Sequence, residues 1–202
     1  MKKIATFLLI FISAFSLTAC GSESPETEIP ITGDGTLDGD AGKTLIVFFS
    51  WGGNTRTVAN HIHDLIGGDM VEVETVTPYP DRYEEVIQIA PEELANDYRP
   101  PLKTRVENMD EYDTLIVGTP IWGGHLTPAM KSFLASYDLS GKVIAPFCTH
   151  GGSGTSQSVN DIRSVCPDDV TFLTPLAIYG NRAEDARGDV EEWLAQIGII
   201  KQ

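Results

Sequence analysis

Apolar and polar positions alternate in blocks along most of the chain, and the lengths of these blocks predict alternating strands and helices. Short, almost wholly apolar runs predict buried strands at 44–49, 70–76, 113–119, 142–148 and 170–178. Helical patterns between or after them predict helices at 54–66, 82–97, 128–136, 155–165 and 183–197. Strands that alternate with helices are typical of an α/β fold, with a doubly wound parallel sheet and helices on both faces. Such sheets bind ligands beyond the carboxyl ends of their strands, so the loops that follow the strands are the candidate sites.

The loop after the first predicted strand has the composition of an anion-binding site. Gly52 and Gly53 allow a tight turn and a close approach of the backbone to a ligand. The polar side chains of Ser50, Asn54, Thr55 and Thr57 add donors where a helix begins, and the unpaired N–H groups there already favour a phosphate. An ordinary capped turn between a strand and a helix would use the same residue types. The loop lacks the lysine of nucleoside triphosphate loops and the spacing of the dinucleotide fingerprint, so it predicts a phosphate monoester held by neutral donors.

The segment Ser50-Trp51-Gly52-Gly53-Asn54-Thr55 resembles the Ser/Thr-x-Thr-Gly-Asn-Thr phosphate loop of flavodoxins, which bind FMN. Gly52 replaces the usual loop hydroxyl. The resemblance implies a flavodoxin-like, five-stranded parallel sheet with the strand order 2-1-3-4-5. It also implies the short-chain subgroup, because the predicted fifth strand is unbroken, whereas an insertion splits that strand in the long-chain subgroup.

Two further loops extend the resemblance. Residues 119–123 resemble the Thr-Pro-x-Trp loop of flavodoxin-like proteins, whose aromatic residue lies beside the isoalloxazine ring. The glycine-rich loop 149–154 corresponds to the loop whose amides bond the pyrimidine edge of the flavin. Two alternatives remain open, namely that Trp122 packs on its own domain and that the third loop needs its glycines only for turns. The FMN site implied by the resemblance comprises Ser50, Trp51, Gly52, Asn54, Thr55, Thr119, Pro120, Ile121, Trp122, Gly123, Thr149, His150, Gly151 and Gly152.

The N-terminal residues predict export. Lys2 and Lys3 precede an uncharged run, 4–17, which is shorter than the roughly 20 residues of a membrane-spanning helix. The run ends in Leu-Thr-Ala-Cys, which resembles the bacterial lipoprotein cleavage box, in which Cys20 becomes the lipidated N-terminus; the alternative is a signal peptide followed by a chance cysteine. We therefore expect a signal peptide at 1–19 and an exported lipoprotein held at a membrane of the cell envelope. Residues 20–42 have few large apolar side chains and predict a flexible acidic linker, followed by one flavodoxin-like domain at 43–202.

The chain is strongly acidic, with a net charge of −15. Removal of 1–19 would leave 12 basic and 29 acidic residues, a net charge of −17. Such a surface repels nucleic acid and suits a basic protein partner, although solubility alone would also account for it. We expect no disulfide between Cys148 and Cys166, because a strand end and the far end of the next helix lie about 15 Å apart, against a limit of about 7 Å. The four histidines are scattered and predict no metal site.

Flavodoxin-like folds host both electron carriers and NAD(P)H-dependent reductases, so the fold alone does not decide the activity. The short single domain, its negative charge and the lack of an obvious nicotinamide platform favour a membrane-tethered electron carrier. An exported reductase would also lack the cytoplasmic supply of NAD(P)H. A carrier needs no general acid or nucleophile in the chain, since the flavin performs the redox chemistry. The alternatives are an NAD(P)H-dependent FMN reductase of quinones or flavins, and a flavin-free binding module on the same fold.

Overall fold

A computed structural model of the 202-residue chain describes residues 35–37 and 40–201. The predicted signal peptide, Cys20 and most of the predicted linker lie outside the described residues. Within the described part of the chain, no helix combines the length and the apolar composition needed to cross a membrane.

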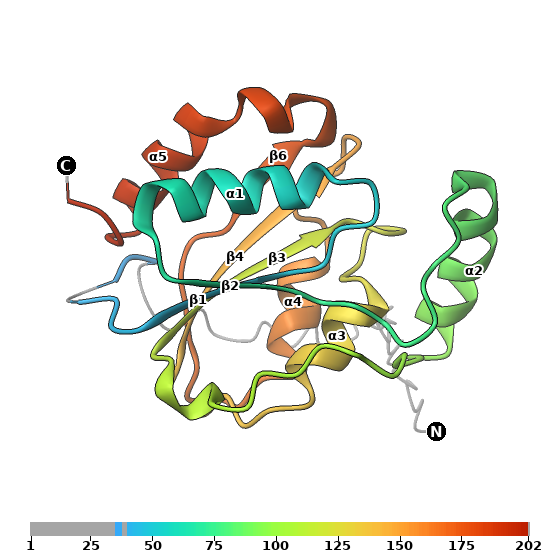
Figure 1. Ribbon diagram of the computed structural model, residues 1–202, viewed down its shortest axis with the longest axis horizontal. Helices are drawn as coiled ribbons and strands as arrows, with labels where there is room; N and C mark the ends of the chain where they lie inside the picture. Colours follow the sequence, from blue (N-terminus) through green and yellow to red (C-terminus); the bar gives the residue numbers. More distant parts are fainter. Residues whose placement is uncertain (1–34, 38–39, 202) are drawn as a thin grey trace, which may run out of the picture. The chain divides into compact units, whose positions relative to one another are not determined.

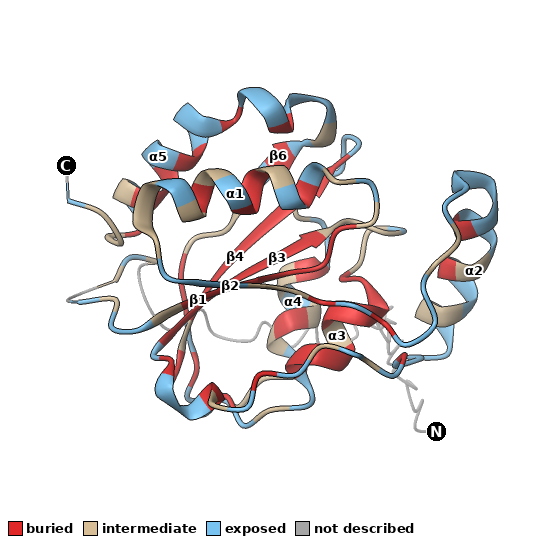
Figure 2. Ribbon diagram, in the orientation of Figure 1, coloured by how far each residue is buried: buried red, intermediate tan, exposed pale blue. Residues whose placement is uncertain are grey.

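The centre of the domain is a parallel sheet with five strand positions (Figure 1). Four of them are β1 (Thr44–Phe48), β2 (Asp69–Glu72), β3 (Thr114–Pro120) and β4 (Val143–His150). Two short strands, β5 (Thr171–Phe172) and β6 (Leu176–Tyr179), share the fifth position, and both pair with β4. The strand order β2-β1-β3-β4-β5 confirms the predicted α/β fold and its 2-1-3-4-5 order. The central strands are buried almost throughout, because both faces of the sheet are covered (Figure 2).

Helices cover the two faces of the sheet in pairs (Figure 1). On one face, α1 (Asn54–Ile66) and α5 (Arg187–Gln196) enclose a core with Ile46 and Phe48 of β1. On the other face, α3 (Pro128–Leu134) and α4 (Ser158–Arg163) enclose a second core with Leu45 and Val47. Successive side chains of a strand point to opposite faces, so one apolar run supplies both cores.

The chain between β2 and β3, which contains the predicted helix 82–97, leaves the sheet. Helix α2 (Tyr83–Ala95) stands beyond the carboxyl ends of the strands, apart from the other helices (Figure 1). Only Val86 and Ala90 of this helix are buried. A single 3-10 turn, η1 (Met109–Glu111), precedes β3. The helix therefore covers the candidate ligand edge of the sheet, and it adds little to either core.

The second strand is shorter than the predicted range 70–76 because its last residues pair elsewhere. Parallel pairing with β1 ends at Glu72. Beyond it, Glu74 N donates to Thr104 Oγ1 at 2.7 Å and Val76 N donates to Pro101 O at 2.8 Å. Residues 74–76 thus pair with the chain returning from α2, which the apolar pattern alone did not indicate.

The prediction of an unbroken fifth strand at 170–178 is wrong. Residues 173–175 separate β5 from β6, and no longer segment is inserted there. Thr174 leaves the ladder because its N–H donates to Gly35 O at 2.8 Å and its carbonyl accepts from Trp193 Nε1 at 2.8 Å. Pro175 has no N–H to donate. Helix α4 is also shorter than the predicted range 155–165. Helix α5 begins later than predicted, because a 3-10 segment, η2 (Gly180–Asp185), takes the place of its first turn.

Candidate functional site

The three candidate loops meet at the carboxyl edge of the sheet, and Thr149 joins them. Thr149 Oγ1 lies 2.8 Å from Thr55 Oγ1 of the first loop, and this hydroxyl pair is buried. Thr149 O accepts a hydrogen bond from Ile121 N of the second loop at 2.9 Å. Thr149 and His150 belong to β4 itself, because that strand runs two residues further than predicted. One residue at a strand end therefore fixes the relative positions of all three loops.

The start of α1 presents backbone N–H groups to this edge. Gly53 is the N-cap of the helix, with a φ of 92°, and makes no side-chain hydrogen bond to it. Ser50 Oγ accepts from Arg56 N at 3.2 Å, whereas no acceptor for the N–H groups of Asn54 and Thr55 occurs among the described residues. A helix N-terminus with unpaired N–H groups is suited to an anion. An added Cβ at Gly52 would meet no atom within 4 Å, so the missing hydroxyl leaves open space.

The polar loop carries no unpaired cation. The guanidinium of Arg56 binds Glu72 through two hydrogen bonds, from Nε to Oε2 at 2.8 Å and from Nη2 to Oε1 at 2.6 Å. This ion pair neutralises the positive charge nearest to the helix start. A phosphate at this edge would therefore meet hydroxyl and amide donors, in agreement with the cation-poor loop seen in the sequence.

An aromatic cluster forms the other half of the site. The Trp122 ring makes edge contacts with Tyr79, at a centroid distance of 4.9 Å, and with Phe49, at 5.7 Å. Trp51 Nε1 donates to Pro80 O at 2.7 Å. Trp122 is only half-buried, so it both packs on its own domain and faces outward. The orientation of both indoles is fixed by the segment that leads into α2.

Tyr79 is a site residue that the sequence interpretation missed. Its hydroxyl donates to Glu93 Oε2 at 2.8 Å, which ties the aromatic cluster to α2. Burial, and then the bond to Glu93, raise the pKa of Tyr79 above its ordinary range. Burial likewise raises the pKa of Glu93, and the bond from Tyr79 partly offsets that effect. The available signal was the Pro-Tyr-Pro sequence at 78–80, which holds an aromatic residue rigidly at the ligand edge.

A groove of about 500 Å³ separates α2 from the Trp122 loop. Helix α2 therefore lies beside this groove. Four candidate residues line it, and α2 supplies an apolar wall opposite them. The candidate residues are Trp51, Ile121, Trp122 and Gly123, and the α2 residues are Tyr83, Val86, Ile87, Ala90, Pro91 and Leu94.

The third loop is more self-contained than predicted. Gly152 N donates to His150 Nδ1 at 2.9 Å, so this amide is engaged within the loop. The His150 ring packs against Tyr179 at a centroid distance of 4.5 Å. Gly180 follows, and a Cβ there would lie 2.7 Å from Asn54 Nδ2, so glycine allows Asn54 to lie against the end of β6. Tyr179 and Gly180 thus connect the third loop to the first from the fifth strand position.

Gly151 of the third loop is exposed, with open space around it. The last two candidates, Thr119 and Pro120, lie at the end of β3. Thr119 Oγ1 is 3.1 Å from Thr127 Oγ1, and both residues are buried. This hydroxyl pair joins the end of β3 to the start of α3. Thr119 therefore holds the two ends of the second loop together. Ile121, Trp122 and Gly123 of the same loop border the groove.

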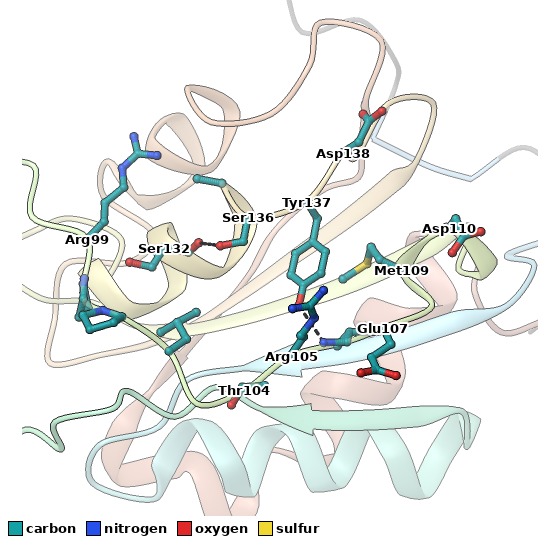
Figure 3. Close-up of a pocket in the computed structure, with 15 residues that line it drawn as sticks. Arg99, Thr104, Arg105, Glu107, Met109, Asp110, Ser132, Ser136, Tyr137 and Asp138 are labelled. Carbon is teal, nitrogen blue, oxygen red and sulfur yellow. Dashed lines mark hydrogen bonds between the residues drawn. The ribbon is translucent and has the colours of Figure 1, made fainter.

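A cavity larger than this groove lies elsewhere, between residues 99–110 and the end of α3 (Figure 3). Its volume is about 750 Å³, and none of the candidate residues lines it. Arg99 and Arg105 line it together with acidic residues such as Asp110, and Tyr137 Oη accepts from Val106 N at 2.8 Å. The site assignment therefore follows the convergence of the loops, and cavity size does not override it.

The two cysteines of the domain are buried to different degrees. Cys148 and Cys166 are both free thiols. Burial raises the pKa of Cys148 to about 12. Burial also raises the pKa of Cys166, to about 11, although the charge of Arg163 lowers it slightly. Both groups therefore stay protonated at neutral pH. No cluster of three metal-ligating side chains occurs in the described part of the chain.

Comparison with known proteins identifies relatives of this arrangement. The model of one family, described as Flavodoxin, matches residues 43–197. A candidate flavoprotein from Bacteroides eggerthii is 25% identical, with a TM-score of 0.68 over 78% of this chain and 99% of that one. A candidate flavoprotein from Bacteroides uniformis is 24% identical, with a TM-score of 0.67 over 77% and 99%. A flavoprotein from Lactobacillus acidophilus, solved in complex with FMN, is 22% identical, with a TM-score of 0.59 over 76% and 99%.

Proposed function

The chain belongs to the flavodoxin family, and from this premise we propose that its domain binds FMN and passes electrons to or from a protein partner. The observation that carries the proposal is the convergence of three loops on Thr149, which brings the helix N-terminus of α1 and the Trp122 loop to one edge. The FMN complex of the Lactobacillus relative is consistent with it.

The residues at this edge fit the two ends of FMN. The unpaired N–H groups of Asn54 and Thr55 and the hydroxyls of Ser50 and Thr55 provide donors for a phosphate. Trp122 offers an indole held by its neighbours, beside which a planar ring can pack. Bound FMN would supply the one- and two-electron chemistry, while these residues bind and orient it.

The partner follows from the charge of the protein. A net charge of −15, or −17 after loss of 1–19, favours association with a basic redox protein. We also propose that Cys20 carries lipid and tethers the domain to a membrane of the cell envelope, with the acidic linker as a spacer. The support for the tether comes from the sequence, namely the two lysines and the uncharged run 4–17 before the Leu-Thr-Ala-Cys segment.

The decisive experiment is reconstitution of the purified chain with FMN. We expect stoichiometric binding, seen as quenching of FMN fluorescence and as a flavin absorption spectrum. A colourless protein that leaves FMN fluorescence unchanged would refute the proposal and favour the flavin-free module.

A second measurement separates carrier from reductase. After FMN loading, we expect slow reduction by NADH or NADPH, and association with a basic redox protein that weakens as salt shortens the Debye length to about 10 Å. Rapid reduction by NADPH would instead favour the reductase.

The tether is tested by a Cys20→Ser variant expressed in bacteria that process lipoproteins. We expect it to lose lipid labelling and membrane association while keeping the flavin spectrum. Normal lipid labelling of this variant would disprove the anchor.

A further inference from the structure

The cavity beside the end of α3 has the size and lining of a ligand site of its own. It lies between the chain that returns from α2 and the end of α3 (Figure 3). Its volume of about 750 Å³ falls within the range of roughly 300–1,000 Å³ that is usual for ligand pockets. None of the residues assigned to FMN lines it. The apolar part of its wall consists of Leu102, Val106, Met109 and Tyr137, together with Pro100, Pro101 and Ala135.

Part of this wall is an unpaired edge of extended chain. Val76 N donates to Pro101 O at 2.8 Å, and Lys103 N donates to Glu74 O at 2.8 Å. Backbone groups alternate in direction along an extended chain, so the N–H and C=O of the intervening Leu102 point to the opposite side. No hydrogen-bond partner for the backbone of Leu102 occurs among the described residues. These two groups can therefore pair with one further extended chain.

Arg105 brings an unpaired positive charge to the same cavity. Each of the other six arginines in the described part of the chain has an ion pair with a carboxylate or, for Arg163, a contact with the Phe172 ring. No such contact of Arg105 occurs among the described residues. Figure 3 shows its side chain directed toward Tyr137, whose Oη accepts from Val106 N at 2.8 Å. A guanidinium presents paired N–H donors that match the two oxygens of a carboxylate.

Ser132 is a second unsatisfied group at this cavity, which it lines from the end of α3. It is 6% exposed. Its Oγ is the one buried side-chain nitrogen or oxygen without a hydrogen-bond partner in the part of the chain that the structure describes. A buried hydroxyl without a partner is unfavourable, and an occupant with amide groups along its length offers it donors and acceptors.

We propose that this cavity binds the carboxyl-terminal end of an extended peptide whose last residue is apolar. The peptide backbone pairs with Leu102 as an added strand, and the terminal carboxylate pairs with Arg105. The last side chain contacts the apolar wall, at Val106, Met109 and Tyr137. An added strand, a carboxylate and an apolar side chain together account for the three kinds of unpartnered group in the lining.

The charges around the cavity narrow the class of peptide. Glu107 and Asp110 line it as well, and neither has an ion-pair partner among the described residues. A ligand with several negative charges would be repelled by these two carboxylates and by the net charge of −15. A ligand without a negative charge would leave Arg105 unpaired. A single carboxylate on an otherwise uncharged chain fits both conditions.

Binding is tested by calorimetry on the full chain with four tetrapeptides, acetyl-Ala-Ala-Ala-X, in which X is Leu, Val, Met or Phe. Each is compared with its carboxamide. We expect one site for at least one of the free acids, with about tenfold weaker binding of the corresponding carboxamide. Failure of all four acids to bind, or equal affinity of acid and carboxamide, would overturn the proposal.

The role of Arg105 is tested by Arg105→Gln at this exposed position. The variant should bind the acid about as weakly as the carboxamide, while its affinity for the carboxamide stays the same. Lys103→Gln is the matched control, because it removes the same charge two positions away and Lys103 does not line the cavity. It should keep the preference for the acid. Loss of that preference in both variants, or in neither, would refute a carboxylate contact at Arg105.

Strand pairing is tested by hydrogen exchange of individual amides. The amide of Leu102 should become protected when the peptide binds, whereas the amide of Lys103, already bonded to Glu74 O, should change little. Unchanged exchange at Leu102 would refute the added strand. FMN should leave the peptide affinity unchanged, and competition between the two ligands would place the peptide at the flavin edge and overturn this site. A chain that fails to bind FMN would refute the proposed function and not this inference.

Discussion

The two ends of the candidate site are built in different ways. The proposed phosphate end is local, because Ser50, Gly53, Asn54 and Thr55 lie within six residues of one another at the turn from β1 into α1. The ring end is assembled from distant segments, since Trp122 is held by Phe49 and Tyr79, and Tyr79 is tied in turn to Glu93 of α2. The first end consists of polar, neutral donors, and the second is a half-exposed aromatic cluster.

This difference indicates that the two ends recognise a ligand by different interactions. A loop that presents hydroxyls and helix amides recognises a charged group by hydrogen bonds, and its geometry changes little when distant contacts change. An aromatic cluster recognises a flat ring by contact area. Because this cluster is hydrogen-bonded to α2, its geometry depends on the position of that helix. Variants at the two ends should therefore affect different parts of the same ligand.

The largest expected effect is at the phosphate end. Thr55→Val removes a buried hydroxyl, and a hydrogen bond to a charged group is worth about 1.5–3 kcal/mol. FMN binding should weaken about 10- to 100-fold, while riboflavin, which has no phosphate, should bind nearly as before. Thr57→Val is the control, because Thr57, although the sequence suggested it as a further donor, directs its Oγ1 to Glu184. Equal losses for FMN and riboflavin would place the phosphate elsewhere.

The ring end should respond without discriminating between the two ligands. Trp122→Leu removes the indole beside the proposed ring position, and aromatic stacking is worth about 1–3 kcal/mol. FMN and riboflavin should both weaken, by roughly 5- to 50-fold, when measured by fluorescence titration. A loss confined to FMN would contradict the division between the two ends.

A smaller gain is expected from Gly52→Ser. The position has open space and no left-handed φ, so the side chain fits without strain. The restored hydroxyl should tighten FMN by about threefold, because the cost of ordering the new side chain offsets part of the added hydrogen bond. Riboflavin affinity serves as the control and should not change. Weaker FMN binding by this variant would show that the loop is already complete with glycine.

The smallest effect concerns the tie between the aromatic cluster and α2. Burial raises the pKa of Glu93, so the folded state holds this proton more tightly than the unfolded state does. The contribution of Glu93 to stability is therefore present at low pH and is lost as pH rises through its raised pKa. We therefore expect the melting temperature of Glu93→Gln minus that of the wild type to be more positive at pH 7 than at pH 4. Glu92→Gln, on an exposed neighbour, should show no such trend.

The sequence predicted the sheet well because its central strands are continuous apolar runs. β1, β3 and β4 lie within two residues of their predicted ends, and three loops follow them in the expected order. The failures occurred where a backbone group had a partner far along the chain. Val76 pairs with Pro101, and Thr174 pairs with Gly35 and Trp193. No local pattern records such partners.

The same contrast holds for the site. The proposed phosphate loop could be recognised in the sequence, because its conformation depends on the residue types of Gly53, Asn54 and Thr55 themselves. Tyr79 was not recognised, since it acquires its role from a distant carboxylate, Glu93. An isolated tyrosine in a sequence has no such signature.

The sequence by itself therefore determined the family, the sheet and the position of the polar loop, because apolar periodicity and glycine-dependent turns are local properties of the chain. Only the tertiary structure decided that Thr149 joins the three loops and that α2 closes an apolar groove over Trp122. It also decided that the unpaired backbone of Leu102 and the side chain of Arg105 border one cavity. The physical reason is that hydrogen bonds between residues 29 to 94 positions apart depend on packing, which no stretch of local sequence encodes.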